Sequence, residues 1–260
     1  MINLFKKKKI SNYKIKTFAF SIISLGIIFE LAITLPHLEN NKTKFEMTYS
    51  DKFQEKGFDG RLFLLISTND NSEPRFQIND NHNSQQIFGI DVNNWNSNEK
   101  ITINENAIGY PLQTLNEIKE GEYYVQAFLH KYETFNLSTG HTVKLPMDQG
   151  EGQKWNISPK NLYSTTKKIK ITKSGIIKLN LDNEIPAIKP AENTDFIKHI
   201  KIKSDMLSEF WGRDMYLQAN VLVPYEFNKN SKTKYPLMIF HGHFPYTFGG
   251  FRTSAPTAPK

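Results

Sequence analysis

Gly121–His130, with the sequence GEYYVQAFLH, is the stretch that decides the fold predicted for this chain. Successive side chains of a β-strand point to opposite faces, so that every second residue shares a face. One face of this segment would carry Tyr123, Val125, Ala127 and Leu129, and the other would carry Tyr124, Gln126, Phe128 and His130. The segment is the strongest predicted β-strand of the chain, and the expected fold is built outward from it.

Shorter runs of the same type lie on both sides of this strand. They are Arg61–Thr68, Arg75–Ile78, Ile87–Val92, His141–Leu145, Lys167–Thr172 and Gly175–Leu181. Clusters of Asn, Asp, Ser and Gly separate most of them, as expected for turns. Many short strands with few helical patterns predict a mainly β fold, with an Ig-like β-sandwich over residues 58–185. Because these strands can pair with one another, we expect residues 55–190 alone to fold cooperatively.

Polar and proline-containing segments divide the chain into regions. Residues 36–57 precede the predicted sandwich and are largely polar, which indicates a linker. Residues 186–195 contain Pro186 and Pro190 and indicate a second linker, this time between two domains. The region that follows, residues 196–260, is therefore treated as a separate unit.

The first 35 residues have the composition of a targeting or membrane segment. Six lysines lie within the first sixteen residues, and Thr17–Leu35 is an apolar run of nineteen residues whose one charge is Glu30. Such a run is long enough to span a bilayer and also fits a signal peptide. Ala32-Ile33-Thr34 is only a loose match to a cleavage site, so a cleaved signal and an uncleaved anchor both stay open. Either one predicts export to the periplasm or cell surface, or membrane anchoring, rather than a buried core helix.

Charge and cysteine content exclude several classes of function. The chain has 260 residues, a net charge of +7 and no cysteine, which excludes a disulfide framework, a catalytic thiol and a cysteine-based zinc site. Five of the seven net positive charges lie in residues 1–35, so the remainder of the chain is nearly neutral. A nearly neutral body is a poor surface for a phosphate backbone, and no nucleic-acid partner is expected.

The last region contains three predicted strands, and the third ends in a histidine–glycine turn. The first two are His199–Lys203 and Tyr216–Val223, and the third is the apolar run Leu237–Phe240, which follows a proline. A short apolar run of this kind predicts a fully buried strand of a parallel sheet. The backbone N–H groups of Gly242 and His243, just beyond it, are candidates for an oxyanion hole. The alternative is an ordinary turn that ends a strand.

Several segments together resemble one family. In the last region they are Phe210-Trp211-Gly212-Arg213, Ala219–Pro224 and Tyr235–Phe244, and upstream they are Gly121–Ala127, Pro146–Gly152 and Asn161–Ser164. With these motifs, about Asp59 to Phe251 resembles exported bacterial esterase-like α/β-hydrolases that carry a β-sandwich before the catalytic domain. The resemblance implies a β-sandwich followed by the first strands of an α/β-hydrolase domain. It also implies a serine carboxylic-ester hydrolase without metal or cofactor, acting on a small-molecule or saccharide-linked ester.

The chain departs from this family at the nucleophile. The family places its serine in Gly-x-Ser-x-Gly after the His-Gly loop, with the acid and the histidine further on. No Gly-x-Ser-x-Gly occurs in these 260 residues. We therefore expect a truncated hydrolase, a fragment with no catalytic residue of its own that is inactive alone. The rival interpretation is a non-enzymatic β-sandwich binding module tethered to the cell envelope.

Other candidate site residues have weaker patterns. Trp211 and Arg213 are candidates for a substrate cleft, although the indole of Trp211 is more simply explained by packing under the first strands. His241 and His243 have the spacing of a metal-binding pair, with Asp214 or His199 as a conceivable third ligand, but no metal is expected. A sugar-binding platform would need exposed aromatic rings from the set Trp95, Tyr123, Tyr124, Phe128, Tyr132, Phe135 and Trp155, whereas strand spacing favours the core.

Overall fold

The computed structural model describes residues 43–53, 57–190, 192–224, 227 and 232–240. The predicted leader, residues 1–35, lies outside these described residues, as do His241, Gly242 and His243. Within them the protein is mainly β, in agreement with the predicted fold class.

The strands and the α-helix follow one another in this order. They are β1 (Thr43–Tyr49), β2 (Phe58–Ser67), β3 (Gln86–Trp95), β4 (Ile101–Ile103), β5 (Ile108–Tyr110), β6 (Gly121–Lys131), β7 (Glu133–Asn136), β8 (Thr142–Leu145), β9 (Leu162–Tyr163), β10 (Lys167–Ile171), β11 (Gly175–Leu181), β12 (Asn183–Glu184), β13 (Ile197–Lys203), α2 (Asp205–Trp211) and β14 (Tyr216–Leu222). Short 3₁₀ turns lie between them, including η2 (Pro74–Phe76) and η4 (Trp155–Ile157).

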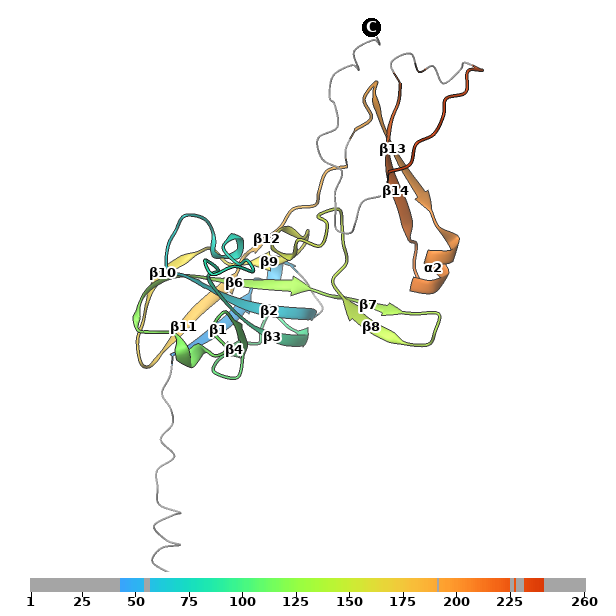
Figure 1. Ribbon diagram of the computed structural model, residues 1–260. Helices are drawn as coiled ribbons and strands as arrows, with labels where there is room; N and C mark the ends of the chain where they lie inside the picture. Colours follow the sequence, from blue (N-terminus) through green and yellow to red (C-terminus); the bar gives the residue numbers. More distant parts are fainter. Residues whose placement is uncertain (1–42, 54–56, 191, 225–226, 228–231, 241–260) are drawn as a thin grey trace, which may run out of the picture. The chain divides into compact units, whose positions relative to one another are not determined.

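The strand predicted over Gly121–His130 is confirmed as β6, which lies in the middle of a seven-stranded sheet. The order in this sheet is β12-β9-β6-β2-β3-β5, with β10 also pairing with β6. Figure 1 shows β6 beside β2, and their antiparallel register places Leu62 opposite Leu129 and Ile66 opposite Val125. Because directly opposed residues share a face, these pairs form one apolar row across the sheet.

A smaller sheet contains a strand that the sequence did not reveal. Its order is β11-β1-β4, with β1 parallel to β11 and antiparallel to β4. The expectation of a linker over residues 36–57 is therefore wrong for β1. Phe45, Met47 and Tyr49 of β1 are buried in the core. Their alternation with Lys44, Glu46 and Thr48 is the period-two signal that was available.

One hydrophobic core joins the two sheets, and a second cluster covers the other face of the larger sheet. The first cluster combines Phe45 and Met47 of β1 with Leu64 of β2 and Leu129 of β6, among others. The second contains Leu65, Phe128 and Ile185, with partly buried aromatic rings packed against it. Both faces of β6 are therefore buried, which explains why its residues are apolar in consecutive positions.

The other sequence-based strand predictions have mixed outcomes. Ile87–Val92, Lys167–Thr172, Gly175–Leu181 and the two strands after the second linker correspond to β3, β10, β11, β13 and β14. Arg75–Ile78 is not a strand, because Pro74–Phe76 forms the 3₁₀ turn η2 with Pro74 at its start. Proline fixes a helical φ and lacks an N–H for a strand ladder, which favours the turn.

The C-terminal ribbon consists of β13 and β14 joined through α2. All seven residues of each strand pair, from Ile197 opposite Leu222 to Lys203 opposite Tyr216. The Ser204 hydroxyl accepts a hydrogen bond from the Leu207 N–H and caps the helix. Gly212 ends the helix with φ of 66°, and a Cβ there would lie 2.6 Å from the Asn136 carbonyl oxygen. The turn therefore requires glycine for two independent reasons.

The run Leu237–Phe240 is not a buried strand in this protein. These four residues have no regular secondary structure, and their side chains are 73–89% exposed. The apolar pattern alone predicted burial. A strand of a parallel sheet pairs with strands on both sides, and none of the sheets of the described residues includes Leu237–Phe240.

Burial of His130 in β6 makes the stability of the β domain depend on pH. Desolvation lowers the pKa of His130 to about 4, from an ordinary value of 6.5. The unfolded chain then binds a proton that the folded chain does not, so that stability falls as pH drops from about 6.5 towards 4. We expect a loss of about 1–2 kcal/mol from this group, since part of the ring is solvated. Urea unfolding at pH 7 and pH 4.5 measures it.

The matched variant for this test is His130→Gln, which cannot take up a proton in this range. Carboxylates titrate in both proteins, so only the difference between the two pH dependences reports on His130. An identical loss of stability in both proteins would contradict the prediction.

Candidate functional site

Trp211 and Arg213 attach α2 to the β7–β8 hairpin. The Trp211 ring lies edge-on to Phe135 with centroids 5.3 Å apart, and Phe135 is only 2% exposed although β7 is a four-residue strand. The Arg213 guanidinium forms an ion pair with Glu133 and lies 5.3 Å from the Phe135 ring. The predicted packing of the indole is therefore observed, but against β7 rather than under the first C-terminal strands.

A main-chain hydrogen bond strengthens this attachment. The Ser138 N–H donates to the Phe210 carbonyl oxygen at 2.9 Å, and the Phe210 ring lies 5.4 Å from that of Trp211. These contacts fix the end of α2 and therefore the start of β14. A role for Trp211 and Arg213 in lining a substrate cleft stays a prediction, since both side chains are engaged in packing and pairing.

Gly242, His243 and His241 all lie outside the described residues. Of the conceivable third metal ligands, Asp214 pairs with Lys203 at 2.6 Å, and the hydrogen bond from this lysine lowers the pKa of the Asp214 carboxyl. His199 Nδ1 lies 2.6 Å from the Asn220 amide oxygen. Within the described part of the chain, no three His, Cys, Asp or Glu side chains gather in a metal-binding group.

The aromatic side chains that a sugar platform would need are mostly in the core. Trp95, Phe128 and Phe135 are buried, and Trp155 packs edge-on to Phe128 with ring centroids 5.1 Å apart. The interpretation of these rings as core residues is therefore confirmed, and an aromatic platform on the sheet is wrong for these positions.

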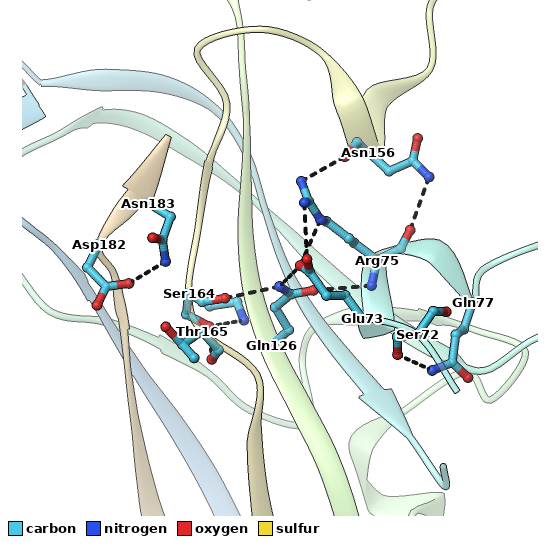
Figure 2. Close-up of polar contacts among 11 residues, drawn as sticks. Ser72, Glu73, Arg75, Gln77, Gln126, Asn156, Ser164, Thr165, Asp182 and Asn183 are labelled. Carbon is cyan, nitrogen blue, oxygen red and sulfur yellow. Dashed lines mark hydrogen bonds and ion pairs between the residues drawn. The ribbon is translucent and has the colours of Figure 1, made fainter. Parts of the chain in front are cut away.

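A buried polar network around Arg75 was not predicted from the sequence. Arg75 is 8% exposed, and Figure 2 shows its guanidinium directed at Glu73 and at the Asn156 carbonyl oxygen. The Arg75 backbone N–H donates to the Gln126 side-chain oxygen at 3.2 Å. The Gln126 amide nitrogen donates in turn to Glu73 at 2.7 Å and to the Ser164 carbonyl oxygen at 3.0 Å.

The Arg75 network stabilises the fold rather than presenting groups to a ligand. The Asn156 amide donates to the Arg75 carbonyl oxygen at 3.2 Å, so that η2 and η4 are joined in both directions. The guanidinium also lies 4.1 Å from the centroid of the Tyr163 ring. Every charged group in the network has a partner, as a buried charge requires. Gln126, a polar residue inside an apolar strand, was the sequence signal for it.

A shallow polar hollow lies among the loops that surround η2. It has a volume of about 530 Å³ and is lined by Asn69, Asn71, Gln77, Asn79, His82, Asn83, Ser84 and Gln85. The loops are shaped by their own side chains: the Asn71 N–H donates to the Asn69 side-chain oxygen, and the Asn81 N–H to that of Asn79. Six of the lining residues carry side-chain amides, and the other two are His82 and Ser84.

Comparison of the chain with protein-family models, with curated proteins and with solved structures found no match. Among the residues that the structure describes, no helix is long and apolar enough to cross a membrane.

Proposed function

We propose that the C-terminal ribbon and the segment after it open an esterase-like α/β-hydrolase domain, behind an Ig-like β-sandwich formed by residues 43–185. The observation that carries this proposal is the exposed apolar face of the ribbon. Ile200, Ile202 and Leu217 are 44%, 57% and 57% exposed, and the register places Ile202 directly opposite Leu217 on one face. An apolar face on two strands alone is marginal in water and belongs to a larger sheet.

The order of the segments supports the same proposal. An antiparallel pair of strands is followed by a polar stretch and then by the exposed apolar run Leu237–Phe240. The backbone N–H groups of Gly242 and His243 come next in the sequence and would hold the oxyanion of a tetrahedral intermediate. Serine attack with histidine as general base would complete the reaction, with neither metal nor cofactor.

The proposed setting is outside the cytoplasm. The lysine cluster and apolar run within residues 1–35 favour export or membrane anchoring of the body that follows. The proposed substrate is a carboxylic ester of a small molecule or of a saccharide. Nucleic acid is not a proposed partner, because the charge beyond residue 35 is nearly balanced.

Residues 1–260 alone are expected to show no ester hydrolysis above background. They contain no Gly-x-Ser-x-Gly, so that an oxyanion hole would have no positioned nucleophile to serve. The measurement is the hydrolysis of short-chain aryl esters by purified residues 36–260, compared with the same protein carrying Gly242→Pro. Both rates should equal the rate in buffer. Turnover that survives purification and disappears in Gly242→Pro would contradict the expectation and require another nucleophile.

A second test concerns the proposed membership of the esterase-like hydrolase family. The nucleotide sequence after codon 260 can be read for an open frame with Gly-x-Ser-x-Gly, followed by an acidic residue and a histidine. Such a frame would support the hydrolase. A sequence without any hydrolase remnant would favour the second candidate function.

The second candidate is a non-enzymatic binding module tethered to the envelope. The polar hollow among the Asn-rich loops favours it, because neutral amide and hydroxyl groups suit a ligand with many hydroxyls. Calorimetric titration with neutral oligosaccharides, comparing the parent with Asn83→Ala, separates the two functions. Saturable binding that Asn83→Ala weakens would favour the module.

A further inference from the structure

The outer edge of β14 is the longest strand edge without charged residues in the described part of the chain. Among the described residues β14 pairs only with β13. Every second residue of an antiparallel strand turns its backbone N–H and C=O away from the first partner. A row of such groups is a template for pairing with another strand.

The charges of the ribbon distinguish its two edges. β13 has the sequence IKHIKIK and carries Lys198, Lys201 and Lys203, whereas β14 has the sequence YLQANVL and carries neither charge nor proline. Lysine and proline are the usual means of protecting a strand edge. A copy of β14 would approach β14 without like-charge repulsion, while a copy of β13 would meet three lysines on β13.

We propose that β14 pairs antiparallel with β14 of a second copy of this chain and joins the two ribbons into one four-stranded sheet. The proposal does not rest on the hydrolase assignment, and it gives the ribbon a second copy, rather than further strands of a hydrolase domain, as the partner that extends its sheet.

The register of this pairing follows if all seven residues of β14 pair about a two-fold axis. β14 comprises seven residues, so a two-fold arrangement that pairs all of them places Ala219 opposite Ala219 of the second copy. Leu217 then lies opposite Val221, and Gln218 lies opposite Asn220. Leu217, Ala219 and Val221 alternate with polar Gln218 and Asn220. Their side chains therefore lie, in both copies, on the face that carries Ile200 and Ile202, with Lys198 at one end of it. The other face pairs Gln218 with Asn220 and Tyr216 with Leu222, none of which is charged.

The chain has no cysteine, so a single introduced cysteine reports this register directly. Opposed residues of an antiparallel pair have Cα atoms about 4.5–5.5 Å apart, within the span of a disulfide. Ala219→Cys in the full chain, kept in mild detergent, should therefore form a disulfide-linked dimer on mild oxidation. Leu217→Cys is the matched control, because the two copies of Leu217 would lie about 13 Å apart, beyond disulfide reach.

Charge changes test whether the contact is β14 itself. Gln218→Glu and Asn220→Glu together place like charges opposite each other across the proposed dimer. Within one copy, Lys201 lies opposite Gln218 and His199 opposite Asn220, so the ribbon itself tolerates both glutamates. In the Ala219→Cys background these two repulsive pairs should lower the dimer yield by roughly two- to thirtyfold. Gln218→Glu with Asn220→Lys should restore the yield, since a glutamate of one copy would then face a lysine of the other in both pairs.

Three outcomes decide the proposal. A dimer of Ala219→Cys that exceeds that of Leu217→Cys, falls with the two glutamates and returns with the glutamate–lysine pair establishes it. Equal yields for Ala219→Cys and Leu217→Cys overturn the register and the proposal with it. Association that is unchanged by all charge variants also overturns it, because another surface would then hold the copies together.

Discussion

Residues 57–190, which lack β1, are expected not to fold, whereas residues 42–190 fold in a single cooperative transition. β1 contributes Phe45, Met47 and Tyr49 to the core, and each is at most 3% exposed. Burial of side chains of this size contributes about 2 kcal/mol each. Their joint loss is comparable with the whole net stability of a domain, about 5–15 kcal/mol. β11 and β4 would also lose the strand that joins them.

Circular dichroism and urea titration of the two fragments measure this effect. Residues 42–190 should give a β-type spectrum and a sharp transition, and residues 57–190 should give neither. The expectation replaces the one drawn from sequence alone, in which residues 55–190 sufficed. Equal transition midpoints for the two fragments would show that β1 is dispensable and would restore the boundary at residue 55.

Glu73→Ala is expected to destabilise the β domain by about 3 kcal/mol, because it leaves a buried guanidinium without its carboxylate. The Arg75 side chain is 9% exposed, and its Nε lies 3.0 Å from the Glu73 carboxylate. Glu73 also accepts from the Arg75 Nη2 at 3.4 Å and from the Gln126 amide at 2.7 Å, so the substitution removes three charge-assisted hydrogen bonds of the network. Chemical denaturation at pH 7 measures the loss.

The matched control is Asp91→Ala, which removes the partner of Arg61. That pair has a similar distance, 2.9 Å, but its side chains are more exposed, at 28% for Arg61 and 66% for Asp91 against 9% for Arg75 and 40% for Glu73. An exposed pair contributes at most about 1 kcal/mol. The double variant Glu73→Ala with Arg75→Met should recover most of the lost stability, because no buried charge then remains unpaired. Similar losses from Glu73→Ala and Asp91→Ala would mean that burial of Arg75 has no energetic consequence.

A strand with a long apolar run could be predicted from the sequence, whereas a strand of alternating apolar and polar residues beside a polar segment was missed. β6 was found because both of its faces are buried, which leaves a long apolar run. β1 was missed because its three core residues alternate with Lys44, Glu46 and Thr48 beside a polar segment. Arg75–Ile78 was assigned wrongly because the proline before Arg75 was given too little weight.

The candidate site could be predicted only where a local motif carried it. Trp211 and Arg213 were identified from Phe210–Arg213, but their contact with Phe135 joins residues far apart in the sequence and has no local signal. The same limit applies to Arg75, whose partner Asn156 is 81 residues away. Leu237–Phe240 shows the converse error, since an apolar pattern indicates a preference for burial but does not supply the surrounding elements.

The parallel pairing of β1 with β11 has a consequence for biosynthesis. Thr48 and Asn180 hydrogen-bond across 132 residues, and the whole of β1 lies beside Gly175–Leu181. During translation β1 leaves the ribosome early, yet its partner emerges only when most of the domain has been made. Contacts between such distant residues form slowly, because a long loop must close first. In the interval Phe45, Met47 and Tyr49 are uncovered, so the nascent chain presents an apolar strand that a chaperone can hold until residue 181 appears.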